Sequence, residues 1–327
     1  MKCDGFSRRF PTMTLVFAAI VTCATLGSRD ALASVVPTLY VVEHTTNNDD
    51  VLAYAGSTII PSFDINLSQA TSVTLGPDGK LYVANTESGG QVYRYDAITG
   101  AAIAGNPFVV YTGALAAPEG MKFNTNGNLY IADTTQSNVQ VFDPAGSPVA
   151  TLNGTGGPAQ PIDVAFDHAT HSLYVADDSG VEKYNPATQN FFNVVLAATG
   201  GPSIPIDLAF GPDDKLYVLD YSTNSIFRYN ADGTNQQTFA TLDNTFVPNK
   251  MAFGPDGLLY ISGADLFAPT ALQGEILQIS NGGSSIATYI TGLNNPGFMV
   301  FATVPEPTTL CLLLAGTIPM LRRGRTF

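Results

Sequence analysis

Side chains that could bind a cation or do chemistry lie at the ends of short apolar runs spread along the chain. They are Glu43, His44, Asn85, Glu119, Asp133, Asp163, Asp177, Asp207, Asp220 and Asn249. Carboxylate and amide oxygens are the ligands that calcium prefers. Glu119 and Asn249 each follow a proline directly, and Glu43 departs from the pattern of the other runs. Glu43, Glu119 and Asn249 are therefore the candidate metal ligands, with calcium as the candidate ion.

The alternative is that these residues bind no metal. In the other runs the position after the proline holds residues with no side-chain oxygen, namely Ile162, Ile206 and Gly297. The aspartates also have structural interpretations, because Asp side chains readily accept hydrogen bonds from nearby backbone amides. We expect two of them to cap turn amides where strands begin and three to fix the loop after a strand, respectively Asp163 and Asp207, and Asp133, Asp177 and Asp220.

Histidines offer little support for catalysis. His168 and His171 are three residues apart, a spacing that can suit a metal. They lie in a predicted hairpin turn with no third ligand nearby, so we expect surface residues. His44 has no identifiable acid or nucleophile partner, and the sequence contains no catalytic triad pattern, phosphate loop or nucleotide motif. The sequence does not exclude an enzyme but favours a protein without catalytic activity.

A repeated unit of short strands carries these residues. It is clearest at Pro205–Asn230, PIDLAFGPDDKLYVLDYSTNSIFRYN, which has three apolar runs separated by a Pro-Asp turn and a polar loop. Such a pattern predicts a three-stranded meander. Equivalent tyrosines recur 42 to 48 residues apart, at Tyr40, Tyr82, Tyr130, Tyr174, Tyr217 and Tyr260. A period of this length with strand content is typical of β-propeller blades.

The repeat resembles the NHL family of β-propellers and, more loosely, the gluconolactonase-like propellers. The shared features are a Pro-x-Asp-x-Ala-Phe start, a Pro-Asp-Gly turn, a Leu-Tyr-Val/Ile-Ala-Asp strand and a closing aromatic-Asp pair, as at 161–166, 77–79, 173–177 and 142–143. The resemblance covers about residues 38 to 302. Gluconolactonase-like propellers hold a metal with Glu, Asn and Asp side chains from different blades. This resemblance implies a hydrolase or lyase, possibly calcium-dependent, as the alternative to a binding function.

We therefore predict an all-β, six-bladed propeller of four-stranded blades over residues 34–303. The first blade lacks its inner strand, and Pro296–Ala302 matches that missing strand. We expect this segment to pair beside Leu39–Glu43 and close the ring, which removes exposed sheet edges. We expect the outer strand of the second blade at Ala101–Tyr111, and a functional loop or a plug at the insertion Ala264–Gly274.

The two ends of the sequence read as targeting signals. Residues 1–33 combine basic residues, an apolar stretch and Ala31-Leu32-Ala33, as in a secretory signal peptide. Residues 304–327 combine Pro-Glu-Pro, a short apolar run and an arginine cluster. This tail resembles the PEP-CTERM sorting signal of bacterial envelopes, which implies an exosortase as partner. The apolar run is short for a permanent membrane span, so contact with the membrane would end at processing.

The body between these signals is strongly acidic, with 7 basic and 24 acidic residues. Nucleic acids and anionic lipids need a basic surface, so both are unexpected partners. All three cysteines lie in the end segments, which excludes a disulfide or thiol chemistry in the body. The sequence thus predicts an exported binding or scaffold module at the bacterial surface or extracellular matrix. Its ligand would be a carbohydrate or a protein.

Overall fold

All regular secondary structure in the described residues is β-strand, in six antiparallel sheets of four strands each. The computed structural model describes residues 37–44, 49–87, 89–110, 117–154, 156–177, 180–196, 202–265 and 273–302. None of these residues forms a helix that could span a membrane. The prediction of a six-bladed propeller of four-stranded blades is confirmed. The predicted signal peptide and sorting tail lie outside the described residues.

Each sheet is one blade, whose strands follow one another from the inner to the outer edge. Blade 1 contains β24 (Pro296–Phe301), β1 (Thr38–His44), β2 (Asp49–Ala55) and β3 (Thr58–Leu67). Blade 2 contains β4 (Ala70–Leu75), β5 (Lys80–Asn85), β6 (Gln91–Asp96) and β7 (Val109–Val110). Blade 3 contains β8 (Pro118–Phe123), β9 (Leu129–Asp133), β10 (Asn138–Phe142) and β11 (Pro148–Leu152).

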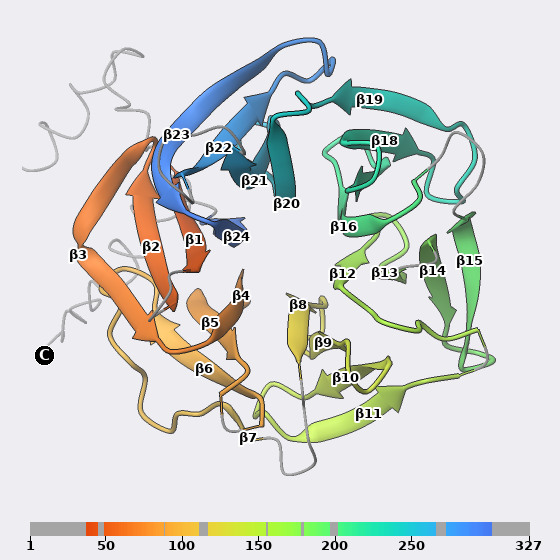
Figure 1. Ribbon diagram of the computed structural model, residues 1–327. Coiled ribbons are helices and arrows are strands. Elements are labelled where there is room, and N and C mark those ends of the chain that lie inside the picture. The colour runs from red at the N-terminus through yellow and green to blue at the C-terminus, as the bar shows by residue number, and fades with distance from the viewer. Residues whose placement is uncertain are drawn as a thin grey trace, which may run out of the picture. The chain divides into compact units, whose positions relative to one another are not determined.

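The remaining three blades repeat this order. Blade 4 contains β12 (Asp163–Phe166), β13 (Leu173–Asp177), β14 (Gly180–Asn185) and β15 (Asn190–Leu196). Blade 5 contains β16 (Pro205–Phe210), β17 (Leu216–Asp220), β18 (Ser225–Tyr229) and β19 (Gln237–Thr241). Blade 6 contains β20 (Phe246–Phe253), β21 (Leu259–Asp265), β22 (Gln273–Ile279) and β23 (Ile286–Asn294). The inner strand of every blade faces the centre of the ring (Figure 1).

The last strand closes the ring inside the first blade, as the sequence predicts. In β24, Met299 pairs with Val41 and Phe301 with Leu39, antiparallel to β1. The backbone N–H of Ala302 then donates to the carbonyl of Thr38 at 2.8 Å. Strand β1 is thereby paired on both sides, with β24 and with β2, and β24 takes the place of an inner strand in blade 1.

Aromatic pairs join neighbouring blades and explain two recurring features of the repeat. In five of the six blades the tyrosine of the second strand packs against the phenylalanine that ends the inner strand of the next blade. Ring centroids are 4.7 to 5.0 Å apart in Tyr82–Phe123, Tyr130–Phe166, Tyr174–Phe210, Tyr217–Phe253 and Tyr260–Phe301. Such tilted and edge-to-face pairs stabilise beyond their buried area. Phe301 gives blade 6 the same partner that an internal blade would have.

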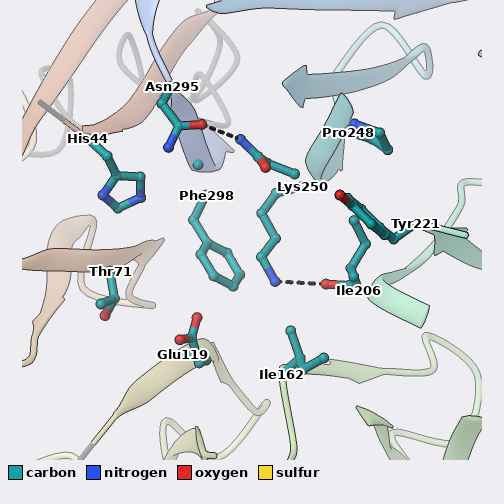
Figure 2. Close-up of a pocket in the computed structure, with 12 residues that line it drawn as sticks. His44, Thr71, Glu119, Ile162, Ile206, Tyr221, Pro248, Lys250, Asn295 and Phe298 are labelled. Carbon is teal, nitrogen blue, oxygen red and sulfur yellow. Dashed lines mark hydrogen bonds between the residues drawn. The ribbon is translucent and has the colours of Figure 1, made fainter. Parts of the chain in front are cut away.

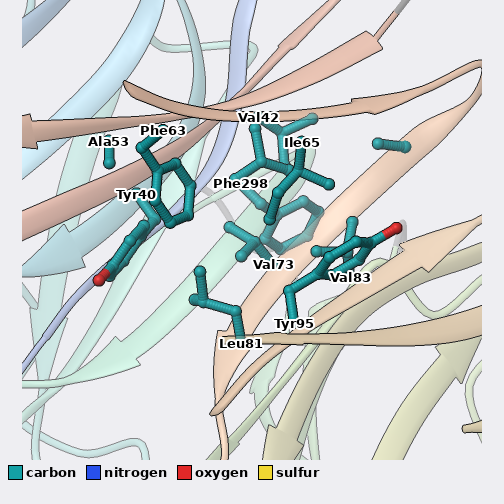
Figure 3. Close-up of a cluster of buried hydrophobic side chains, with 12 residues drawn as sticks. Tyr40, Val42, Ala53, Phe63, Ile65, Val73, Leu81, Val83, Tyr95 and Phe298 are labelled. Carbon is teal, nitrogen blue, oxygen red and sulfur yellow. The ribbon is translucent and has the colours of Figure 1, made fainter. Parts of the chain in front are cut away.

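The contact between blades 1 and 2 replaces this pair with aliphatic packing. Leu75 ends the inner strand of blade 2 where the other blades have phenylalanine, and it packs against the cluster that contains Tyr40. Figure 3 shows this cluster, in which Phe63 and Ile65 of blade 1 meet Val73 and Leu81 of blade 2. Phe298 of β24 reaches the same cluster, so the closing strand contributes to this core as well.

The outer strand of blade 2 is shorter than the prediction of Ala101–Tyr111. Regular pairing with β6 covers only Val109–Val110. The side chain of Asn106 takes the place of a backbone peptide, because its Oδ1 accepts from Arg94 N and its Nδ2 donates to Arg94 O, both at 2.8 Å. The edge of β6 is therefore satisfied without a continuous strand. Of the predicted insertion at 264–274, residues 266–272 lie outside the described part of the chain.

Candidate functional site

Two cavities occupy the space between the inner strands, one toward each end. The mouth cavity, of about 360 Å³, is lined near the start of all six inner strands, by residues that include Thr71, Glu119, Ile206, Asn249 and Phe298 (Figure 2). The distal cavity, of about 640 Å³, is lined by residues of five of these strands, β8, β12, β16, β20 and β24. Phe298 lines both cavities and separates them.

Glu119 points into the mouth cavity (Figure 2). Burial raises the pKa of its carboxyl, an effect that electrostatic interactions with Lys250 and His44 partly offset. Within the described part of the chain, no hydrogen bond or ion pair engages this carboxyl. It is therefore available to a ligand as an acceptor or, when protonated, as a donor.

Asn249 lines the same cavity as Glu119, as the shared position after a proline predicts. Its Nδ2 donates to Asn295 Oδ1 at 3.0 Å and to the carbonyl of Pro296 at 2.9 Å. These bonds join the inner strands of blades 6 and 1 and fix the orientation of the amide. The side-chain oxygen of Asn249 accepts no hydrogen bond from any other described residue, which leaves it as a possible ligand atom.

Glu43 lies outside the residues that line either cavity. It is buried, it accepts a hydrogen bond from Asn294 Nδ2 at 3.4 Å, and burial raises the pKa of its carboxyl. The structure thus brings two of the three candidate ligands together and places the third apart from them. Among the described residues, no group of three or more His, Cys, Asp or Glu side chains is arranged to hold a metal ion. Calcium binding stays a prediction.

One register position of the inner strands forms a set of buried residues, of which only Asp163 and Asp207 were among the candidates from the sequence. These waist residues stand two positions after the proline that opens each inner strand, or after Ala70 in blade 2. They are Ser72, Gly120, Asp163, Asp207, Lys250 and Phe298. All six are buried. Comparison of this single position among the six repeats shows two acids and one base, and that is the signal that could have revealed the cluster.

Lys250 is the basic member of the waist. Its Nζ donates to the carbonyl of Ile206 at 2.8 Å and lies 4.1 Å from the centroid of the Phe298 ring. The ammonium therefore has a hydrogen bond and a cation–π contact in place of water. None of the ion pairs found within the described ranges joins it to a carboxylate.

The prediction that Asp163 and Asp207 cap turn amides is wrong. Both lie in inner strands, and each is only 2% exposed. Asp207 accepts from the backbone N–H of Met251 and so links blade 5 to blade 6. Asp163 packs against Gly120, where an added Cβ would lie 1.8 Å from Asp163 Oδ1. The buried aspartates thus connect blades, and Gly120 provides the space for one of them.

The other aspartates behave as the sequence predicts. Asp133 accepts from Gln136 N, Asp177 from Gly180 N and Asp220 from Thr223 N, all at 2.9 to 3.1 Å. Each therefore fixes the loop that follows the second strand of its blade. His168 and His171 are exposed, and His168 Nδ1 lies 3.3 Å from Asp214 Oδ1. Their interpretation as surface residues is confirmed.

Asp207→Asn should make the stability of the protein less dependent on pH. Burial, followed by the negative charge of Asp163, raises the pKa of Asp207 well above its ordinary range. Above about pH 4 the folded state therefore holds a proton that the unfolded state has lost, and stability falls as pH rises through the raised pKa. Asparagine is neutral throughout and can still accept from Met251 N. Urea unfolding at about pH 5 and about pH 8 measures this difference. If both proteins lost the same free energy of unfolding between about pH 5 and about pH 8, Asp207 would not be the group whose raised pKa makes stability depend on pH.

Comparisons with known proteins identify the fold. No protein-family model and no curated protein matches this chain. A chain in a crystal structure of a nidogen–laminin complex is 17% identical, with a TM-score of 0.60 over 82% of this chain and 98% of that one. Virginiamycin B lyase from Staphylococcus aureus is 12% identical, with a TM-score of 0.56 over 82% of this chain and 92% of the lyase.

A catalytically inactive variant of the same lyase, with quinupristin, is also similar. It is 12% identical, with a TM-score of 0.54 over 83% of this chain and 93% of that chain. Identities this low show a shared architecture and carry no information on activity. This chain is a six-bladed β-propeller with the fold of these structures.

Proposed function

We propose that this propeller is exported to the bacterial surface or extracellular matrix and binds a carbohydrate or protein ligand in its mouth cavity. The mouth cavity itself carries this proposal. Its volume of about 360 Å³ falls in the range of small-ligand sites, which combine apolar walls with a few polar groups. Ile162, Ile206 and Phe298 supply apolar wall, while Glu119 and Asn249 supply oxygen atoms.

The rim of the cavity adds an exposed aromatic surface. Tyr221 is 50% exposed and lines the mouth cavity. Its backbone N–H donates to the carbonyl of Ile204, whose side chain is 43% exposed. Exposed apolar side chains beside a cavity are typical of binding surfaces. A sugar ring or an apolar side chain of a surface protein could pack on Tyr221 while its polar groups reach Glu119.

The test is a thermal-shift screen of sugars, followed by binding measurements with the first sugar that stabilises the protein. We expect Glu119→Gln to weaken that binding at least about tenfold, because a hydrogen bond to a charged group is lost. Asp214→Asn is the matched control, since it makes the same change at an exposed turn away from the mouth and asparagine tolerates its positive φ of 58°. Undiminished binding by folded Glu119→Gln would place the ligand elsewhere.

A second candidate function is a hydrolase or lyase of the gluconolactonase type. One observation favours it, because Glu119, whose pKa is raised, and His44 line the same cavity and could serve as acid and base. If calcium takes part, Glu119 and Asn249 would be its ligands. Stabilisation by calcium that is lost in both Glu119→Gln and Asn249→Ala would favour this candidate. No response to calcium in the unmodified protein would remove the metal-dependent form.

The proposed route to the surface rests on the end segments of the sequence. The tail at 304–327 has the features of a sorting signal that an exosortase-type enzyme removes. We expect protein isolated from the surface of its native host to lack the arginine cluster at 322–325. Intact-mass analysis measures this directly. Surface protein that still carries Arg322 to Phe327 would show that the tail is retained as an anchor.

A further inference from the structure

Basic side chains are divided unequally between the two faces of the propeller. The mouth face consists of the loops after the second strands and the loops that join blades, and the distal face consists of the hairpin turns opposite them. Four basic residues pair in register with repeated tyrosines near the distal ends of the second strands, and two more stand where such a strand begins. They are Arg94, Lys122, Lys183 and Arg228, and Lys80 and Lys215.

The mouth face has the opposite composition. Its half-buried or exposed acids are Asp49, Asp50, Glu87, Glu119, Asp243 and Asp265. The one lysine or arginine that the described ranges place in this half is Lys250, which is buried at the waist. Two ion pairs in these ranges join an acid to a lysine or arginine, and both lie on the distal side, Lys80–Asp96 at 3.2 Å and Arg228–Asp213 at 3.8 Å. Negative charge therefore predominates on the mouth face.

The environment of the individual acids supports this charge pattern. Burial raises the pKa of Asp50, and the negative charges of Asp64 and Asp49 raise it further. Asp243 accepts a hydrogen bond from Thr245 N at 2.9 Å, which lowers its pKa and keeps it ionised at neutral pH. Charges of one sign around a cleft raise the local concentration of oppositely charged partners and speed their association.

The mouth cavity has the shape and chemistry to receive a long basic side chain. Ile206 and Tyr221 provide apolar wall near its rim, and the carboxyl of Glu119 points into it (Figure 2). Arginine has an apolar stem and a planar charged end that pairs with carboxylates and stacks on aromatic rings. The ammonium of Lys250 is held at the Phe298 ring and repels a second cation there, so the incoming charge would stop at Glu119. A neutral sugar would gain nothing from the acids, and an acidic sugar would be repelled.

We infer that the mouth face docks a basic segment of a protein, with an arginine side chain that enters the mouth cavity and pairs with Glu119. An apolar neighbour in the same segment packs on Tyr221. The inference rests on the proposed function, because it names the ligand class of the same cavity, a protein and not a carbohydrate. The surrounding acids steer the segment to the opening, so affinity falls as salt rises.

The experiment is calorimetric titration of purified full-length protein with two end-blocked peptides, in which leucine alternates with arginine or with glutamate. We expect saturable binding of the arginine peptide at millimolar concentration or below. Its affinity should fall at least about fivefold between about 0.05 M and about 0.3 M salt, because added salt screens exposed charges. The glutamate peptide has the same leucines and should not bind. Absence of saturable binding by the arginine peptide, or equal binding of both peptides, would overturn the inference.

Paired variants separate docking at the mouth from attraction by net charge. Glu87→Gln with Asp243→Asn removes two charges from the mouth face, and Asp214→Asn with Asp232→Asn removes two from the distal face. Asp243 and Asp232 are closely matched, because each is exposed and accepts from the backbone N–H two residues later, at 2.9 and 3.0 Å. We expect the mouth pair to weaken binding of the arginine peptide at least about threefold and the distal pair less than about twofold. Equal weakening by the two pairs would show that only net charge matters.

Glu119→Gln tests the cavity itself and should weaken binding of the arginine peptide at least about tenfold. The same variant distinguishes failure of this inference from failure of the proposed function. If a sugar binds in a way that Glu119→Gln weakens and the arginine peptide does not bind, the inference is wrong and the proposed function stands. If Glu119→Gln affects neither ligand, both are wrong.

Discussion

A chain that ends at Asn295 should lose most of its stability or fail to accumulate as soluble protein. Truncation there removes β24, and with it Phe298, Met299 and Phe301, all of which are buried. Their burial is worth about 1.5–3 kcal/mol for each large side chain. Together this is a large share of the roughly 5–15 kcal/mol that stabilises a typical domain.

The closing strand contributes to two cores, which increases the expected effect. Phe298 packs in the cluster between blades 1 and 2, while Met299 and Phe301 pack in the cluster that contains Tyr260 of blade 6. Removal of β24 also exposes the backbone of β1 along its inner edge. Both interfaces of blade 1 would therefore open, and the exposed edge would favour aggregation.

The matched control is a chain that ends at Thr303. It retains β24 and the hydrogen bond from Ala302 N to Thr38 O. We expect it to unfold at the same temperature as the full-length protein. Circular dichroism melting curves of the two truncated chains make the comparison. Equal melting temperatures would mean that closure by β24 is not what holds the ring together.

The repeat made the fold predictable because each of its recurring features has one structural role. The proline opens an inner strand, the Pro-Asp turn closes a hairpin, and the tyrosine packs against the phenylalanine of the next blade. Ring closure followed from counting, since Pro296–Ala302 supplied the strand that the first unit lacked. Period, turn chemistry and strand propensity thus all indicated the same architecture.

The details that escaped prediction depend on contacts between residues far apart in sequence. The apolar run at Ala101–Tyr111 suits a strand, but the side chain of Asn106 satisfies Arg94 in its place. Asp163 and Asp207 stand near predicted turns, where aspartate often caps an amide. Their actual neighbours are Gly120 and Met251 of other blades. Only the arrangement around the ring brings these residues together with Lys250.

The candidate site was predictable in position and not in composition. The residue after each proline was expected at one mouth of the channel, and Glu119 and Asn249 both lie there. Glu43 was included because it departs from the repeat, but it faces Asn294 instead. A residue that differs from those at the same position in the other repeats need not make the packing contacts that they make. It does not show which way the side chain points.

Tyr174→Ala should be among the most destabilising single substitutions in the protein. Tyr174 is fully buried and packs edge-on against Phe210 of the next blade, with ring centroids 5.0 Å apart. Lys183 Nζ lies 4.9 Å from its ring centroid, and its hydroxyl donates to the carbonyl of Ala231 at 2.8 Å. Truncation of a buried aromatic side chain to alanine costs about 3–5 kcal/mol.

Two further variants separate packing from hydrogen bonding at this tyrosine. Tyr174→Phe keeps the ring but removes the hydroxyl, which donates to the Ala231 carbonyl and also interacts with Lys183, so we expect a loss of about 1 kcal/mol. Tyr221→Ala is the exposed control and should change stability by less than about 0.5 kcal/mol. Urea unfolding of the three variants and the unmodified protein, with a common slope, measures these differences. If Tyr174→Phe were as destabilising as Tyr174→Ala, the hydrogen bond and not the aromatic contact would hold blades 4 and 5 together.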